Sequence, residues 1–514
     1  MSPRPTGAKW QDNLENRINE EKQMTSIELL DGASSVPKSN NSSWSRLPWN
    51  KFEIATNRLQ MRIAKAEREG RKGKVKALQR ILTCSYAAKA LAVKRVTTNK
   101  GSKTSGIDGI LWSTSNQKIQ AVESLTRRGY KPLPLKRIYI PKKDKGKLRP
   151  LSIPSMRDRA MQALWTMALV PIAEERADPN SYGFRPKRST MDACEQCFIC
   201  LSQDRAPKWI FEGDIHSCFD KISHQWLLEN IPMDKVILKK FLKAGYMDKQ
   251  KLYLSEFGTG QGNIISPTLA LMTLSGLERK VRSAKGRQRS SEKINVISYA
   301  DDFIITASSK ELIEEKVIPI VTEFLEERGL ELSQKKSKIA SIDEGFDFLG
   351  FNVRKYKGKL LTKPAKANVK SFLTEIRTII KSNKAAKTEN LIHQLNPKIR
   401  GWSNYYRNAV SSKAYSYVDE VIYRILKSWM LKRHPNKGKY WINNKYFTKK
   451  GFRQWNFHAM TQDKEGNKIP IYLYRASETK IKRHIKIRGD AHPYNSQFKE
   501  YFKRRNNTSK TRQG

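Results

Sequence analysis

Two adjacent carboxylates carry the sharpest chemical signal in the sequence. Asp301 and Asp302 lie in segment 297–305 (ISYADDFII), between two apolar runs typical of β-strands, as in a hairpin turn inside a sheet. Aspartate is also common in ordinary turns, but strands this apolar must both be buried, which favours a functional interpretation. Buried like charges repel one another unless a cation neutralises them. The pair therefore predicts a site for a divalent metal ion.

A second acidic strand precedes the first in the chain. Segment 209–215 (WIFEGDI) is an apolar run that ends in Asp214 and is followed by Phe219. One aspartate from each of two strands, together with a substrate phosphate, is what two-metal phosphoryl transfer requires. Glu212 is expected to point to the opposite face of the strand from Asp214. This second segment is weak evidence when it is taken alone.

The charge balance points to a polyanionic partner. The 514 residues, enough for three to five structural units, include 99 Lys plus Arg against 49 Asp plus Glu, a formal charge of +50. A ribosomal or histone-like packing protein would also be basic. However, 38% hydrophobic residues, 11 Trp and 19 Tyr favour ordered cores over a low-complexity chain.

Two other classes of protein are disfavoured. No apolar stretch approaches the roughly 18 to 20 residues that cross a bilayer, and the N-terminus has no signal-peptide core, so a soluble, intracellular protein is expected. Cys194, Cys197 and Cys200 have a spacing similar to that of iron–sulfur ligands, but no fourth cysteine follows at the required offset. Their helical spacing favours three small residues on a helix instead.

The pattern of apolar residues divides the chain into segments. Residues 1–50 read as a flexible segment, and 51–96 as two basic amphipathic helices separated at Gly70 and Gly73. Residues 130–361 alternate short strands with helices, which indicates a mixed domain of the α+β class. About three helices are predicted over 363–434. Residues 436–514 combine 20 Lys or Arg and 5 Asp or Glu with aromatic residues, which suits phosphate contact and base stacking.

The two acidic segments and the other motifs follow one another in the order found in the group II intron reverse transcriptases. The chain resembles this family from about Trp49 to its C-terminus. The resemblance implies a right-hand polymerase fold. It divides the chain into a helical N-terminal extension (51–105), fingers and palm (106–361), a helical thumb or maturase domain (362–435) and a basic DNA-binding domain (436–514). It also implies that Asp214, Asp301 and Asp302, helped by the Ile215 carbonyl, form the catalytic site and hold two Mg²⁺ ions.

Nucleotide contacts are also carried over from the family motifs. Phe219 matches the bulky residue that excludes a 2′-hydroxyl, and Gln261, in the Gly-rich loop 258–267, lies near the incoming nucleotide. Lys142 and Arg149, in the basic hairpin 140–151, are assigned to its phosphates, although composition alone fits a solvated charged turn equally well. Lys336 matches a lysine near the triphosphate. The next residue, Ser337, is more usually Thr in the family.

Template and RNA contacts form a third group. Arg185 lies in segment 181–186 (SYGFRP), which resembles a template-contacting motif but also fits an ordinary turn. Segment 346–351 resembles the primer-grip hairpin, with a bulged core strand as the alternative. Segment 399–406 resembles the thumb motif, although its aromatic residues fit a core more readily than RNA stacking. The expected contact residues are Arg185, Phe348, Leu349, Gly350, Arg400, Trp402, Tyr405 and Tyr406.

The resemblance predicts an RNA-directed DNA polymerase that copies group II intron RNA and also helps that RNA to splice. The alternative is a maturase without polymerase activity, and a third hypothesis is another bacterial reverse transcriptase such as a retron enzyme. The expected partners are the intron RNA, target DNA and deoxynucleoside triphosphates, with a homodimer left open and no membrane. The expected location is a bacterial cytoplasm, as a ribonucleoprotein, rather than an organelle. No Cys follows Cys218, so the His-Asn-His endonuclease of many relatives is expected to be absent.

Overall fold

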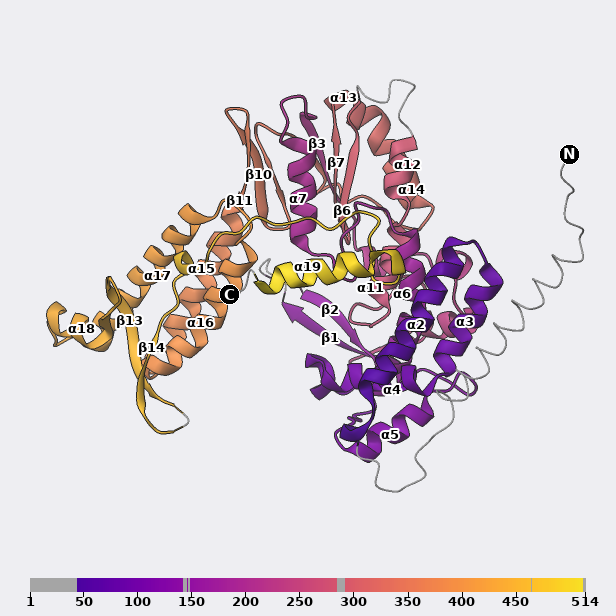
Figure 1. The fold of residues 1–514 in the computed structure, drawn as a ribbon, viewed down its shortest axis with the longest axis horizontal. Coiled ribbons are helices and arrows are strands. Elements are labelled where there is room, and N and C mark those ends of the chain that lie inside the picture. The colour runs from indigo at the N-terminus through magenta and orange to yellow at the C-terminus, as the bar shows by residue number, and fades with distance from the viewer. Residues whose placement is uncertain (1–43, 142–145, 147, 284–291, 464, 512–514) are drawn as a thin grey trace, which may run out of the picture.

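The computed structural model describes residues 44–511 except 142–145, 147, 284–291 and 464. The predicted flexible segment therefore lies almost wholly outside the described residues. Figure 1 shows the N-terminal helices, a central sheet and a separate group of C-terminal helices as three lobes of the chain. In the described part, no helix combines the length and apolar character that a membrane span needs.

The N-terminal region is a cluster of helices. It comprises η1 (Trp44–Arg46), α2 (Trp49–Arg68), α3 (Lys72–Cys84), α4 (Tyr86–Thr98), η2 (Lys100–Lys103) and α5 (Ser115–Ser124), and α2, α3 and α4 pack on the long helix α6 (Met156–Arg176). The prediction of two helices over 51–96 was wrong, because Ser85 is extended (φ −62°, ψ 129°) and divides the second helix in two. Apolar residues continue on both sides of Ser85, so the pattern alone concealed this break.

A small sheet lies beside these helices. Its strands are β1 (Leu135–Pro141), β2 (Leu148–Ile153), β4 (Tyr246–Asp248) and β5 (Lys251–Tyr253), in the order β2-β1-β4-β5. The antiparallel β1–β2 pair is the hairpin expected over 140–151. Helices α8 (Cys218–Lys221), α9 (His224–Asn230) and α10 (Lys235–Leu242) connect the central sheet to β4.

The central sheet carries the acidic segments. Its strands are β6 (Asn295–Tyr299), β7 (Asp302–Ala307), β3 (Trp209–Asp214) and β8 (Lys338–Ser341), in the order β6-β7-β3-β8. On one face, Phe211 and Phe303 join a core shared with α11 (Ser266–Leu274), α12 (Leu277–Ser283) and α14 (Ile318–Glu326), which follows α13 (Lys310–Leu312) and η3 (Ile313–Val317). On the other face, Ile210 and Ile304 pack against α7 (Thr190–Leu201). The predicted mixture of helices and sheets is confirmed.

The three cysteines of interest lie on α7. Cys194 and Cys197 are buried and none of the three forms a disulfide. The prediction of small residues on a helix is therefore confirmed.

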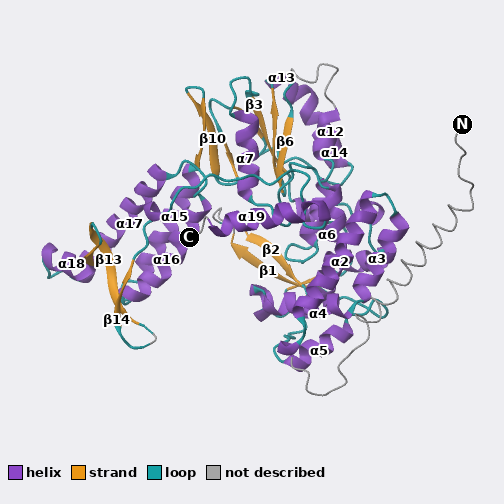
Figure 2. Ribbon diagram, in the orientation of Figure 1, coloured by secondary structure: helices purple, strands orange, loops and turns teal. Residues whose placement is uncertain are grey.

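A three-stranded sheet links the central region to the C-terminal helices. It consists of β9 (Phe346–Phe348), β10 (Phe351–Tyr356) and β11 (Lys359–Pro364), and it leads into α15 (Lys366–Ser382), α16 (Thr388–Tyr405) and α17 (Ser412–Arg433). These are the three helices that the apolar pattern predicts. Figure 2 shows them set apart from the strands of the central sheet.

The C-terminal region begins with α18 (Lys439–Tyr446) and the antiparallel strands β12 (Phe447–Lys450), β13 (Arg453–Gln462) and β14 (Lys468–Tyr472). After η4 (Ala476–Glu478), the C-terminal strap, residues 480–495, returns to the central sheet and continues through η5 (Ser496–Phe498) into α19 (Lys499–Thr511), drawn in yellow in Figure 1. Phe502 of α19 packs in the same core as Ile210 and Ile304. Composition alone did not predict this return path.

Candidate active site

The pairing of β3 with β7 brings the two acidic segments together. Asp214, the last residue of β3, is the register partner of Asp302, the first residue of β7, and Asp301 lies in the turn just before it. In this turn, Ala300 has a left-handed backbone conformation, with φ +59°. Glu212 lies on the same face as Asp214, because residues two apart in a strand share a face, so the expectation of opposite faces was wrong.

The carboxylates of this site are electrostatically coupled. Burial, together with the neighbouring charges of Asp301 and Asp214, raises the pKa of Asp302 to about 6. Burial likewise raises the pKa of Asp301, with a further contribution from Asp214. The neighbouring negative charges therefore disfavour ionisation of Asp301 and Asp302, which is the condition that a bound cation relieves.

Lys336 supplies a positive charge to this cluster. Its Nζ donates to both Oδ1 and Oδ2 of Asp214, each at 3.0 Å, and this hydrogen bond raises the pKa of Lys336. The next residue, Ser337, keeps a hydroxyl beside the end of β3, since the Asp214 amide donates to Ser337 Oγ at 3.3 Å. The departure from the more usual Thr therefore retains the functional group.

The carboxylates of the acidic site fit a magnesium ion chemically. Among the described residues there is no group of three or more His, Cys, Asp or Glu side chains arranged to hold a metal ion. The carboxylates of Asp214, Asp301 and Asp302 are hard oxygen ligands of the kind Mg²⁺ prefers. Ile215, whose carbonyl was predicted to assist, is buried directly after Asp214.

Segment 180–183 packs against the acidic turn and the strand before it through backbone contacts. The Tyr182 amide donates to Ser298 O at 2.9 Å, and the Ser298 amide donates to Asn180 O at 3.0 Å. Gly183 lies so close to the turn that a Cβ atom there would be 2.1 Å from the Ala300 nitrogen. Sequence reasoning missed this role of Gly183, although a glycine in a motif is a signal for close backbone approach.

Arg185 does not lie where a template could touch it. Its side chain is 2% exposed and forms an ion pair with Glu174, Nε to Oε1 at 2.9 Å and Nη2 to Oε2 at 3.1 Å. Its remaining nitrogen, Nη1, donates to the carbonyls of Asp178 and Ser181. The predicted template contact is therefore wrong for this side chain, which instead fixes segment 178–185 against α6.

The described residues that were predicted to bind nucleotide lie on several different elements. Phe219 lies on α8 and meets Phe184 edge to face, with ring centroids 5.9 Å apart. Gln261 donates through Nε2 to Asp220 Oδ2 at 3.2 Å. The charge of Arg149 offsets part of the rise in the pKa of Asp301 that burial causes, so this guanidinium also lies near the cluster. Lys142 lies outside the described residues.

The predicted primer-grip residues form the turn between β9 and β10. Leu349 and Gly350 both have positive φ, 51° and 81°, whereas Phe348 is buried. Two tyrosines at the C-terminal end of α16 hydrogen-bond to the backbone of this turn. Tyr405 Oη donates to Leu349 O at 2.8 Å, and Tyr406 Oη donates to Gly350 O at 3.1 Å. The hairpin and the 399–406 motif are thus in direct contact.

The aromatic residues of the 399–406 motif serve mainly as core. Trp402 stacks on Phe372 with centroids 4.8 Å apart, and Tyr406 is 2% exposed. The predictions of primer contact by the Phe348 side chain and of RNA contact by the Tyr406 side chain are therefore wrong, and the core alternative is confirmed for both. Arg400 lies over the Tyr474 ring at 4.8 Å.

Three family models match successive parts of the chain. The model described as "N-terminal domain of reverse transcriptase" matches residues 44–125, "Reverse transcriptase (RNA-dependent DNA polymerase)" matches 140–353, and "Group II intron, maturase-specific domain" matches 369–447. The order of these matches is the order of the motifs in the sequence. The middle one includes both acidic strands.

Individual relatives agree with these models. Protein YkfC of Escherichia coli (strain K12) is 33% identical over 318 residues, which cover 53% of this chain and 82% of that protein. The group II intron-encoded protein LtrA of Lactococcus lactis subsp. cremoris is 27% identical over 359 residues, covering 56% of this chain and 59% of LtrA. The match thus spans little more than half of LtrA.

A telomerase from Candida albicans, solved with a fragment of telomeric RNA, is 12% identical at a TM-score of 0.36, covering 60% of this chain and 63% of that one. That likeness is too loose to carry a structural argument. The sequence matches define a reverse transcriptase-type protein. The chain belongs to the family of group II intron reverse transcriptases and maturases.

Proposed function

We propose that this protein is an RNA-directed DNA polymerase that copies group II intron RNA by two-metal nucleotidyl transfer, and that it binds the same RNA to assist splicing and mobility. The observation that carries this proposal is the register of β3 with β7, which sets Asp214 opposite Asp302 with Asp301 in the adjoining turn. In this proposal the central sheet is the palm, the β1–β2 hairpin belongs to the fingers, and α15, α16 and α17 form the thumb.

The chemistry follows from the residues around the cluster. Two Mg²⁺ ions, when bound, would activate the primer 3′-hydroxyl and neutralise the leaving pyrophosphate. Asp214, Asp301 and Asp302, with the Ile215 carbonyl, would hold them. Lys336, whose ammonium donates to Asp214, would transfer its hydrogen bonds to a triphosphate when one binds.

Sugar selection and phosphate binding belong to neighbouring side chains. Arg149 provides a guanidinium that can bind a phosphate group in bidentate fashion. The ring of Phe219 provides the wall against which a 2′-hydroxyl would clash, so deoxynucleotides are favoured.

A basic groove on the thumb suits the nucleic acid backbone. It runs between α15 and α17 over an apolar floor that includes Leu373, Val421 and Trp429. Its charged lining is entirely basic: Lys366, Lys370, Arg377, Lys381, Lys384, Lys413, Arg424, Lys432 and Arg433. Such a groove neutralises phosphates and releases counterions, so the affinity for intron RNA should fall steeply as salt is raised.

Primer extension on an RNA template tests the polymerase proposal. With deoxynucleotides and Mg²⁺, the wild-type protein should extend a DNA primer, and the Asp301→Ala/Asp302→Ala variant should be slower by roughly 1,000-fold or more. Intron splicing is measured beside it. If both proteins fail to extend the primer and both assist splicing, the protein is a maturase without polymerase activity and the proposal is overturned.

The remaining partners and the location are part of the same proposal. Target DNA and deoxynucleoside triphosphates are the further ligands, and a bacterial cytoplasmic ribonucleoprotein is the proposed setting. A homodimer stays a prediction, which sedimentation of the protein with and without intron RNA would decide.

A further inference from the structure

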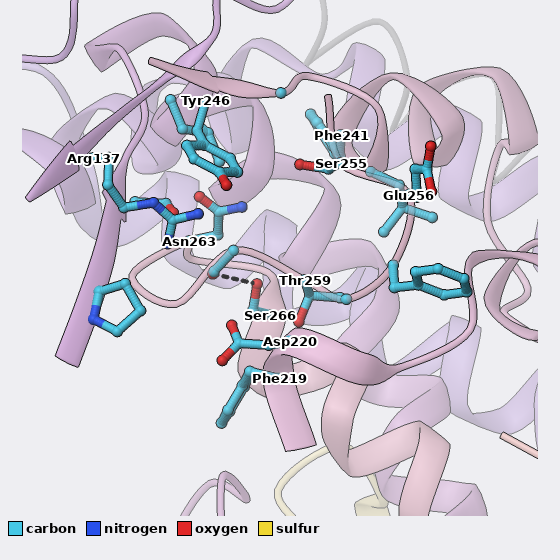
Figure 3. Close-up of a pocket in the computed structure, with 18 of the residues that line it drawn as sticks. Arg137, Phe219, Asp220, Phe241, Tyr246, Ser255, Glu256, Thr259, Asn263 and Ser266 are labelled. Atoms are coloured by element: carbon cyan, nitrogen blue, oxygen red, sulfur yellow. Dashed lines mark hydrogen bonds between the residues drawn. The ribbon is translucent and has the colours of Figure 1, made fainter. Parts of the chain in front are cut away.

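A second cavity lies behind the β1–β2 hairpin. It has a volume of ≈ 420 Å³ and is lined by residues of β1, β2, α8, α10, β4 and the Gly-rich loop. Figure 3 shows the side chains of Arg137, Tyr246 and Asn263 converging on it from different elements. Cavities of this size commonly bind small ligands.

The strand register turns this cavity away from Arg149 of the proposed nucleotide site, while Phe219 borders both. Its lining residues on the hairpin are Arg137 and Tyr139 of β1 with their partners Ser152 and Pro150 of β2. Arg149 is adjacent to Pro150 and therefore points to the opposite face of the hairpin. The cavity and the proposed phosphate ligand thus lie on two sides of one sheet.

Buried polar atoms at the cavity lack partners. Asn263 is 7% exposed and Thr259 is 5% exposed, yet Asn263 Oδ1 and Thr259 Oγ1 have no hydrogen-bond partner among the residues that the structure describes. Arg137 Nε is a third buried atom of this kind. Buried polar groups are normally satisfied, because leaving one unpaired costs free energy. Three such atoms at one cavity therefore indicate a polar ligand.

The walls favour a flat aromatic ligand. The Arg137 guanidinium lies 3.8 Å from the centroid of Tyr246, which in turn stacks on Tyr253 at 5.3 Å. Phe241 and Phe219 add further aromatic surface. Arginine planes and aromatic rings are the surfaces on which proteins stack unpaired nucleobases.

The acidic residues that line the cavity favour entry of the base of a nucleotide over entry of its phosphate. Asp220 and Glu256 line the cavity, and their carboxylates would repel a phosphate group. Lys243, the exposed residue at the end of α10, follows the lining residue Leu242 in the chain. A base can therefore enter while its phosphate stays outside the cavity.

We propose that this cavity binds a single unpaired nucleobase, packed against the aromatic wall that includes Tyr246 and hydrogen-bonded along its edge to Asn263 and Thr259. A nucleobase edge offers donors and acceptors in one plane, which matches an amide oxygen, a hydroxyl and a guanidinium. The base belongs either to a free nucleotide or to a single-stranded part of the RNA. This inference goes beyond the proposed polymerase function, and base binding needs neither Mg²⁺ nor Asp301.

A bound base would also touch the machinery of the neighbouring site. Gly258, Thr259 and Gly260 line the cavity, and Gln261 follows them directly in the same loop. The Ser152 amide, on a residue that lines the cavity, donates to Gln261 O at 2.7 Å. Occupancy of the cavity would therefore restrict the loop that carries Gln261.

Fluorescence of 2-aminopurine riboside 5′-monophosphate, measured without Mg²⁺, tests the free-nucleotide source. The probe should be quenched on binding wild type, and Asn263→Leu should weaken binding at least 10-fold. Asn444→Leu, the same change on the exposed part of α18, should have no effect. Tyr246→Leu provides a second variant that removes part of the aromatic wall should Asn263→Leu fail to fold.

A single-stranded RNA carrying one 4-thiouridine tests the other source. Irradiation should crosslink it to a residue lining the cavity, identified by mass spectrometry, and Asn263→Leu should abolish that crosslink. Binding of either probe with loss in Asn263→Leu supports the proposal and identifies the source. If neither probe binds at the cavity, or if Asn263→Leu and Tyr246→Leu both bind as wild type does, the proposal is overturned. Primer extension by the same proteins separates this outcome from failure of the polymerase proposal.

Discussion

Gly183 lies directly beneath Ala300, so close that a single added methyl group would meet the Ala300 nitrogen at 2.1 Å. The backbone of Ala300 cannot move aside to relieve this clash, as the end of a flexible side chain could. The acidic turn and segment 180–183 therefore move as one unit, tied by the two hydrogen bonds between them.

Gly183→Ala should therefore displace the acidic turn. Primer extension should fall by roughly 100-fold, because misplacing reacting groups by about 1 Å costs that much. The matched control is Gly401→Ala on α16, where an added Cβ meets nothing within 4 Å. Single-turnover extension rates of both variants check the prediction. Equal rates in wild type and Gly183→Ala would contradict it.

Phe184 should set the position of Phe219. Phe184 is 42% exposed and has φ +60°, an uncommon backbone conformation that is often found at functional sites. Its edge-to-face contact with Phe219 is of a kind worth about 0.5 to 1.5 kcal/mol. Phe184→Ala should therefore reduce the preference for deoxynucleotides over ribonucleotides by roughly 2- to 10-fold.

Competition between a deoxynucleotide and its ribonucleotide measures that preference as a ratio of kcat/KM values. A loss of fold alone would lower both rates and leave the ratio unchanged. Phe452→Ala, at the fully exposed turn between β12 and β13, is the control and should keep the wild-type ratio.

Arg185 and Glu174 should stabilise the fold as a pair. Both side chains are almost fully buried, so Arg185→Leu would leave an unpaired carboxylate and should cost about 3 to 5 kcal/mol of unfolding free energy. Arg185→Leu/Glu174→Leu should recover most of that loss. Arg424→Leu breaks an exposed ion pair and should change stability by less than about 1 kcal/mol. Urea denaturation of the four proteins checks this order, and a double variant less stable than Arg185→Leu would refute it.

The local signals in the sequence were sufficient for the two acidic strands but not for their pairing. The apolar runs around Asp301 and Asp214 predict strands, because both faces of the central sheet are buried. Which residue faces which depends on the register of strands distant in the chain, and no local pattern encodes it. Arg185 shows the same limit. The sequence around an arginine in a turn motif is the same whether its guanidinium is solvated or hydrogen-bonded to a buried glutamate. The available signal was Glu174, because a carboxylate within the apolar run of α6 needs a buried positive partner.

Asp302→Asn should stabilise the protein at neutral pH. The folded-state pKa of Asp302, about 6, lies above the usual value near 4, so ionising it in the folded state costs stability. That cost is absent below about pH 4, grows as the pH rises towards 6 and is fully present above it. Since Asp302 is partly exposed, we expect a gain of only about 1 kcal/mol.

Melting temperatures at pH 4 and pH 7.5 measure this gain. The variant should melt roughly 2 °C above wild type at pH 7.5 and together with it at pH 4. Mg²⁺ should narrow the difference at pH 7.5, because a cation relieves the repulsion in wild type. Asp204→Asn, at an exposed position, is the control and should melt as wild type does. A variant less stable than wild type at pH 7.5 would contradict the argument.

Asp192 should hold the C-terminal strap on the central region. Its Oδ1 accepts from His484 Nε2 at 2.9 Å, the Ile487 amide at 2.8 Å and Arg505 Nη2 at 3.1 Å. The hydrogen bond from His484 is the largest of the contacts that lower the pKa of Asp192 to about 2, despite its burial. The stabilisation is thus present above about pH 4 and is lost as the pH falls towards 2.

Asp192→Asn removes this charge and should release the strap. Hydrogen bonds to a charged group contribute about 1.5 to 3 kcal/mol, so the open population should rise about 10- to 100-fold. Trypsin at pH 8, which cleaves after Lys480, Arg483 and Lys486, should cut the variant faster by that factor. Asp343→Asn, in an exposed turn after β8, should be cut at the wild-type rate. If the two variants are cut at the same rate, the strap is held by Arg188 and the α19 core instead, because these contacts do not involve the Asp192 charge.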